Sequence, residues 1–201
     1  MDSKLVSKAQ SRLRIAGKAL DDLRAATNHQ DFADTWYTFL AAAKNVYTSL
    51  EHASKDTPQC RQWFGSIKAQ RKSDELLQYL FQARDDEEHG VESATELQPG
   101  SLSIGVSKPG FSGAMHIRSM SIDGEGRLAS LDATSLDGKP ILVESTPSRT
   151  VLKAVTGRGN IKYDPPTSHL GNSLPDSNPI SVAELGLAYL SGLVEEAGKR
   201  T

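Results

Sequence analysis

The chain has 201 residues, a formal net charge of −2, 37% hydrophobic residues and 24% charged residues, which is typical of soluble globular proteins. Residues 1–90 contain 13 basic and 13 acidic side chains, and residues 91–201 contain 10 and 12. Neither part has the basic excess that marks non-specific nucleic-acid binders, although a local site for a nucleic acid is not excluded.

The first part of the chain is predicted to be an up-and-down bundle of three or four helices, over residues 1–92. Apolar residues recur at helical spacing over residues 4–27 and again over 32–54. A further helical pattern begins after Pro58 and is expected to kink or restart near Asp74. Short connections make neighbouring helices antiparallel. One core is expected to contain Trp36, Phe39, Trp63 and Phe81.

The composition changes after Gly90, which is expected to end the last helix of the bundle. Alternating apolar residues over 101–163 predict five or six strands of a small antiparallel sheet. Asp123-Gly124 and Asp137-Gly138 are typical hairpin turns. The alternation changes phase near Ser119, which indicates a β-bulge.

The end of the chain combines a proline-rich loop with a helix. Residues 164–179 contain no helical or strand period, and a loop of that length must be packed, functional or mobile. Residues 181–199 are predicted to form an amphipathic helix that packs on either the sheet or the bundle. The chain is therefore predicted to be α+β, with a helical bundle at 1–92 and a β subdomain with its C-terminal helix at 100–201.

The sequence lacks the motifs of several common ligand-binding sites. There is no phosphate-binding loop, no GxGxxG motif and no zinc-ligand spacing. Asp86 and His89 have the spacing of a di-metal bundle, but the other helices carry few acids on their apolar faces. We therefore expect no metal site and no cofactor. Cys60 is the only cysteine, which excludes an intrachain disulfide.

The expected location is the cytoplasm, without a membrane partner. The first residues lack the apolar core of a signal peptide. No run in the sequence approaches the roughly 18 apolar residues that a membrane span needs.

The most unusual segment is the end of the fourth helical pattern. Asp85 to Glu88 are four consecutive acids where the helix dipole is already negative, and Arg84 and His89 flank them. Arg84 also lies on the apolar stripe of this helix, seven residues after Leu77. A guanidinium there needs a carboxylate partner, because a buried unpaired charge is very costly.

Arg-x4-His at the end of a helix, late in a small bundle, resembles the HEPN superfamily, whose motif is Arg-x4–6-His. Many members are metal-independent endoribonucleases, often toxins or defence effectors, and two protomers usually pair to bring two motifs into one cleft. The resemblance covers residues 1–90. It implies that Arg84 holds the scissile phosphate by bidentate hydrogen bonds. It also implies that His89 is a general acid or base for attack by the RNA 2′-hydroxyl.

Alternatives to this site remain open. Arg24 and His29 form a second match to the motif, and members of the family often carry an amide where this chain has Asp85. Arg84 and Glu88 have the i, i+4 spacing of a simple ion pair. In that case the chain is a non-catalytic protein-interaction module, with Asp85–Glu88 as the binding residues for a basic protein partner. A third hypothesis, small-molecule binding between bundle and sheet, rests on the proline-rich loop.

Overall fold

The computed structural model describes residues 1–90, 93–106, 114–124, 127–136 and 138–201, and it confirms the α+β class. The described residues form two compact units. The helical unit combines Met1–Glu96 with Val151–Thr201, and the ladder unit is Leu97–Thr150. The helical unit thus includes residues 151–201, whereas the sequence pattern groups them with the strands.

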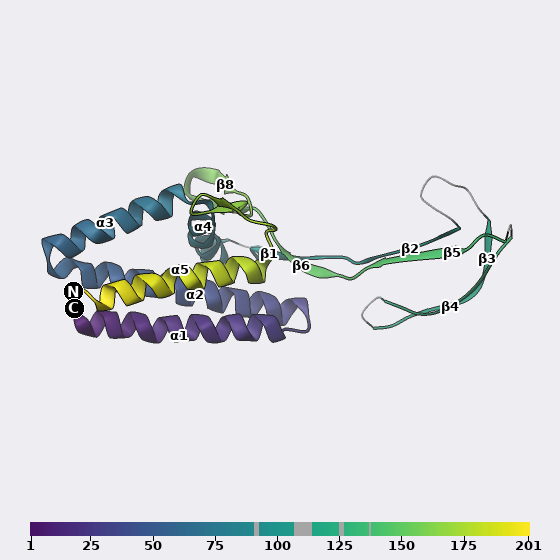
Figure 1. The fold of residues 1–201 in the computed structure, drawn as a ribbon, viewed down its shortest axis with the longest axis horizontal. Helices are drawn as coiled ribbons and strands as arrows, with labels where there is room; N and C mark the ends of the chain where they lie inside the picture. The colour runs from purple at the N-terminus through teal and green to yellow at the C-terminus, as the bar shows by residue number, and fades with distance from the viewer. Residues whose placement is uncertain (91–92, 107–113, 125–126, 137) are drawn as a thin grey trace. The chain divides into compact units, whose positions relative to one another are not determined.

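The helical unit is built from five α-helices (Figure 1). Their bounds are α1 Ser3–Ala25, α2 His29–Ala53, α3 Pro58–Ser73, α4 Glu75–His89 and α5 Pro179–Gly198, with a short 3-10 turn, η1, at Ser54–Asp56. The C-terminal helix α5 packs on the bundle, against α1, α2 and α4, which settles the choice left open by the sequence. The two ends of the chain meet, because the Met1 amino group donates to the Arg200 carbonyl at 2.7 Å.

Polar side chains mark where these helices begin, as helix capping requires. Thr57 caps α3 and is followed by Pro58 at the first helical position. Asp74 caps α4, so the predicted kink is a break between two helices. Helix α5 begins two residues before the predicted start, because Asn178 accepts from the Ile180 N–H at 2.9 Å.

The buried apolar side chains form two clusters within the helical unit. Trp36 and Phe39 have no exposed surface, as predicted. Trp63 and Phe81 are partly buried, and Trp63 packs on the other cluster from Trp36 and Phe39, so the prediction of one core containing all four aromatic residues was wrong. For Trp63 the reason is the phase of α3, whose buried residues are Cys60, Phe64 and Ile67. Phe81 of α4 contacts the cationic groups of Lys44 and Arg71 instead.

The strands pair as antiparallel two-stranded ladders rather than as one sheet. The bounds of the strands up to residue 152 are β1 Thr95–Gln98, β2 Ser101–Val106, β3 Met115–Ile122, β4 Leu128–Ser135, β5 Ile141–Thr146 and β6 Arg149–Leu152. The pairs are nested along the chain, as β1 with β6, β2 with β5 and β3 with β4. The predicted bulge is confirmed by a register shift between Ile117 and Ser119.

The predicted turns lie between these strands. Gly124 lies in a turn that follows β3, and the Asp123 N–H donates to the Arg127 carbonyl at 2.9 Å. The other predicted turn cannot be compared in full, because Asp137 lies outside the described residues.

The helical unit also holds short ladders from the last part of the chain. Their strands are β7 Val155–Gly157, β8 Ile161–Tyr163, β9 Ser168–His169 and β10 Asn172–Ser173, with a 3-10 turn, η2, at Arg158–Asn160. β7 pairs with β8, and β9 pairs with β10.

The proline-rich loop is packed against the start of α4. Glu75 accepts from the Thr167 N–H at 3.0 Å and from its hydroxyl at 2.9 Å. Asp74 accepts from the Leu170 N–H at 2.6 Å, and its other carboxylate oxygen lies 3.0 Å from the His169 ring nitrogen. The loop is therefore a structural part of the helical unit.

Candidate functional site

The predicted site residues lie in the last turns of α4, which ends at Gly90 as the sequence indicated. The Gly90 N–H donates to the Asp86 carbonyl, and a Cβ at Gly90 would lie 2.5 Å from that oxygen. Glycine is therefore required here by a close approach of the backbone rather than by a left-handed conformation.

Arg84 is half-buried and paired with carboxylates, as its position on the apolar stripe predicted. Its guanidinium forms ion pairs with Glu88 and with Asp85, the latter at 3.3 Å. The side chain is 21% exposed. Its Nε is buried without a hydrogen-bond partner in the part of the chain that the structure describes.

Each acid of the run has a partner within the chain. Asp86 accepts from the Thr156 N–H at 3.0 Å. Glu87 accepts from the Ala94 N–H at 2.7 Å. These two carboxylates therefore connect the end of α4 to the chain segments that follow the bundle.

The remaining two acids pair with cations, because Asp85 bonds Lys44 of α2 and Glu88 bonds Arg84. Burial by itself raises the pKa of Asp85, but the hydrogen bonds and charges of Lys44 and Arg84 outweigh it. The net effect lowers the pKa below its ordinary value. Asp85 is therefore ionised at neutral pH.

His89 is the exposed member of the predicted pair. Arg84 and His89 lie on one helix, α4, and His89 is its last residue. The alternative pair is divided between two helices, since Arg24 is in α1 and His29 begins α2. Arg24 also bonds Glu184 of α5 at 2.8 Å.

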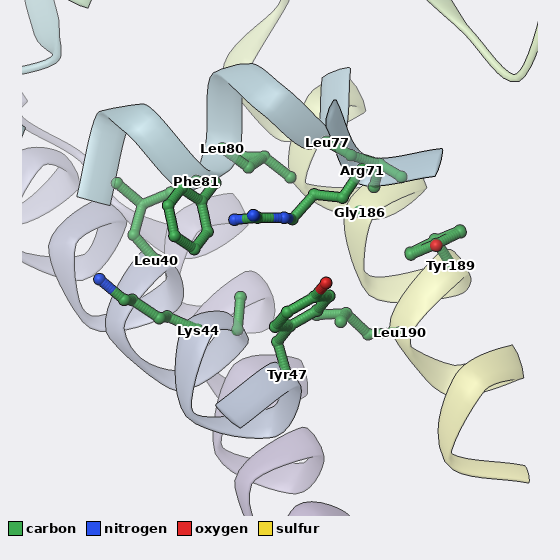
Figure 2. Close-up of a pocket in the computed structure, with 11 residues that line it drawn as sticks. Leu40, Lys44, Tyr47, Arg71, Leu77, Leu80, Phe81, Gly186, Tyr189 and Leu190 are labelled. Atoms are coloured by element: carbon green, nitrogen blue, oxygen red, sulfur yellow. The ribbon is translucent and has the colours of Figure 1, made fainter. Parts of the chain in front are cut away.

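A second feature of the helical unit is a small apolar cavity of about 50 Å³ between α2, α3, α4 and α5 (Figure 2). Its wall is mainly aliphatic and aromatic. The lining residues are Leu40, Ala43, Lys44, Tyr47, Arg71, Leu77, Leu80, Phe81, Gly186, Tyr189 and Leu190. None of these residues is acidic.

Two polar groups in this wall have no hydrogen-bond partner among the described residues, the Tyr47 hydroxyl and the Arg71 Nε. The Arg71 guanidinium lies 3.7 Å from the Phe81 ring centroid and 5.1 Å from that of Tyr47. Figure 2 shows it against the Phe81 ring. Burial raises the pKa of Tyr47 to about 12, while the charge of Arg71 acts in the opposite direction. The hydroxyl is therefore a neutral donor at physiological pH.

Sequence reasoning did not identify this cavity. Arg71 and Tyr47 stand in ordinary helical segments, and they meet only because α2 and α3 pack together. The third helical pattern does contain Arg71, and this arginine was a detectable signal. In the folded chain its guanidinium lies against the rings of Tyr47 and Phe81.

Comparison with known protein families, with curated proteins and with solved structures finds no match to this chain. No helix among the described residues is both long and apolar enough to cross a membrane. The described residues also contain no group of three or more His, Cys, Asp or Glu side chains arranged to hold a metal ion.

Proposed function

We propose that the helical unit is an RNA-binding, metal-independent endoribonuclease of HEPN type that acts as a homodimer. The observation that carries this proposal is the arrangement of Arg84 and His89 on one helix end, with the arginine oriented by two carboxylates and the imidazole exposed. A toxin or defence protein would use such an activity. Two copies are needed, because one Arg–His pair supplies a single proton-transfer group.

The proposed reaction starts with the phosphodiester held by Arg84 through paired N–H···O bonds. The RNA 2′-oxygen attacks phosphorus and forms a cyclic phosphate, while the bond to the 5′-oxygen breaks. His89 donates a proton to that leaving oxygen, and the partner's His89 accepts the proton of the 2′-hydroxyl. Arg84 must leave Glu88 for the phosphate, so Glu88 acts as a competitor for RNA.

The test combines dimer formation with cleavage of single-stranded RNA. His89→Ala should lower the cleavage rate by about 10²–10⁴-fold, the usual contribution of one such group. His29→Ala is the matched control from the alternative motif and should retain the activity. Loss of activity in His29→Ala alone, or no cleavage by a verified wild-type dimer, would refute the assignment.

RNA affinity gives a second, independent readout. Glu88→Gln removes the carboxylate that occupies Arg84 and should raise affinity for single-stranded RNA at fixed salt, whereas Arg84→Gln should lower it. Glu184→Gln is the control, because it removes the carboxylate that bonds Arg24 in the alternative motif. Equal affinity of the wild type and Glu88→Gln would count against phosphate binding by Arg84.

The second candidate function is a non-catalytic protein-interaction module, and a separate observation favours it. The ladder unit leaves large apolar side chains exposed, namely Leu97, Ile117, Met120, Ile122, Leu136, Leu142 and Val143. Large exposed apolar side chains are typical of surfaces that bind an apolar protein partner where they form one contiguous patch. The acidic run gives less support to a basic partner, because Asp85 to Glu88 already bond groups within the chain.

A further inference from the structure

We infer that the cavity between α2, α3, α4 and α5 binds a small carboxylate with an apolar body, either a short fatty acid or an aromatic acid. This site is separate from the proposed RNA site and does not depend on it. The carboxylate would bond Arg71 and the Tyr47 hydroxyl, and the apolar body would contact the leucines of the wall.

The Tyr47 hydroxyl and the Arg71 Nε are buried donors that an anionic ligand could satisfy. Tyr47 is 7% exposed, and its hydroxyl lines the cavity without a hydrogen-bond partner among the described residues. A buried hydroxyl or guanidinium N–H without an acceptor is unfavourable, and such groups usually find a partner. An oxygen placed between Arg71 and Tyr47 would satisfy both groups at once.

The charge of the site fits the same ligand. Arg71 contacts the rings of Phe81 and Tyr47, and none of the described residues that line the cavity is acidic. Lys44 also lies in the wall, with its Nζ 4.9 Å from the Phe81 ring centroid, but it is paired with Asp85. Among the described residues that line the cavity, Arg71 is thus the cation without an acidic partner, and a neutral or cationic ligand would leave it uncompensated.

The size of the space limits the apolar body. The cavity of about 50 Å³ is smaller than the roughly 150 Å³ cavity that holds a benzene ring, so only the end of a short alkyl chain or of a ring would lie inside it. A second, larger pocket of about 280 Å³ shares Arg71 and Phe81 with it and is otherwise lined by Lys72, Gln78, Gln82 and Tyr163. Arg71 stands between the two spaces, where a carboxylate at the mouth of the cavity would meet it.

Binding can be measured with hexanoate and phenylacetate as probes, by NMR shift titration of the whole chain up to about 10 mM, a range suited to ligands of so few atoms. We expect saturable shifts in residues of the cavity for at least one of the two acids. Hexanol and inorganic phosphate are the controls, since they carry the apolar body or the charge alone. No saturable binding of either acid, or equal binding of hexanol, would overturn the inference.

Variants locate the ligand. Arg71→Gln should weaken binding at least tenfold, as expected for a lost hydrogen bond to a charged group, and exposed Arg14→Gln should not change it. Tyr47→Phe should weaken binding roughly threefold to tenfold while the ligand-free protein melts at the same or a higher temperature, because an unpartnered buried hydroxyl is removed. Tyr37→Phe, at a 41% exposed position, is the matched control. Unchanged binding in Tyr47→Phe would place the acid elsewhere and refute the site.

Discussion

Asp74 is expected to be the most important polar side chain for the stability of the helical unit. It caps α4 by accepting from the Leu77 N–H at 2.9 Å, and it also bonds Leu170 and His169 of the proline-rich loop. The residue is only 8% exposed. Asp74→Ala therefore removes a helix cap and two long-range contacts at once, and it leaves buried donors without an acceptor.

The size of the effect follows from these contacts. Loss of a cap costs about 1 kcal/mol, and each buried donor left unsatisfied costs about 1–3 kcal/mol. The terms overlap, so we expect Asp74→Ala to lower the free energy of unfolding by about 3–5 kcal/mol, as for other broken buried pairs. Asp2→Ala is the matched control, because exposed Asp2 caps α1 with bonds to Lys4 and Leu5. It should cost about 1 kcal/mol.

The assay is urea unfolding at pH 7, combined with amide hydrogen exchange over residues 164–178. Asp74→Ala should speed exchange at Leu170, and Asp2→Ala should not. If the two variants lose the same free energy of unfolding, the loop contacts of Asp74 contribute nothing and the reasoning is refuted.

The pH dependence of the free energy of unfolding is also expected to depend on Asp74. Burial by itself raises the pKa of Asp74, but the hydrogen bonds from Leu170, Leu77 and His169 outweigh it and lower the pKa below the ordinary value. A lowered pKa means that this stabilisation is complete above about pH 4, the unfolded value. It is lost as the pH falls from there through the folded pKa. Wild type should therefore lose more stability than Asp74→Ala on acidification below about pH 4.

Three further predictions concern packing and the helix ends. Glu87→Gln should weaken the bond to the Ala94 N–H and speed its hydrogen exchange by about tenfold, which NMR would detect. Gly192→Ala in α5 should raise the free energy of unfolding by up to about 1 kcal/mol, since a Cβ there meets no atom within 4 Å. Gly186→Ala should not give that gain in thermal melts, because its Cβ would lie 2.5 Å from a Leu80 methyl group. An equal gain in both glycine variants would show that α4 and α5 are less closely packed than described.

Residues close in sequence were predictable because local physics determines their structure. The helical spacing and the Thr57-Pro58 start signal gave the helices, and Asp123-Gly124 gave a hairpin turn. The sequence does not determine whether Trp63 or Phe64 is the buried aromatic residue of α3. The two are adjacent, and only the neighbouring helices determine which side faces inward.

The candidate sites were predictable only where their residues are close in sequence. The Arg84–Glu88 pair follows from one turn of helix. By contrast, Thr156 lies 70 residues from Asp86, and no local pattern connects the two. The cavity is harder still to predict, because Tyr47 and Arg71 come from different helices and the wall is closed by α5. A sequence pattern can supply such side chains but not the packing that makes them neighbours.

The acids at the end of α4 illustrate how tertiary contacts reverse a local preference. Acids near a helix C-terminus are unfavourable by about 0.3–1 kcal/mol each when they are exposed. Here Asp86 and Glu87 instead accept from the backbone N–H groups of Thr156 and Ala94, which would otherwise need other partners. A hydrogen bond to a charged acceptor contributes about 1.5–3 kcal/mol, which exceeds the dipole penalty. The acidic run therefore stabilises the end of the helix. Glu88 is 37% exposed and bonds only Arg84 among the described residues. Under the proposed function, Glu88 is thus the acid of this run that an incoming phosphate could displace without breaking the fold.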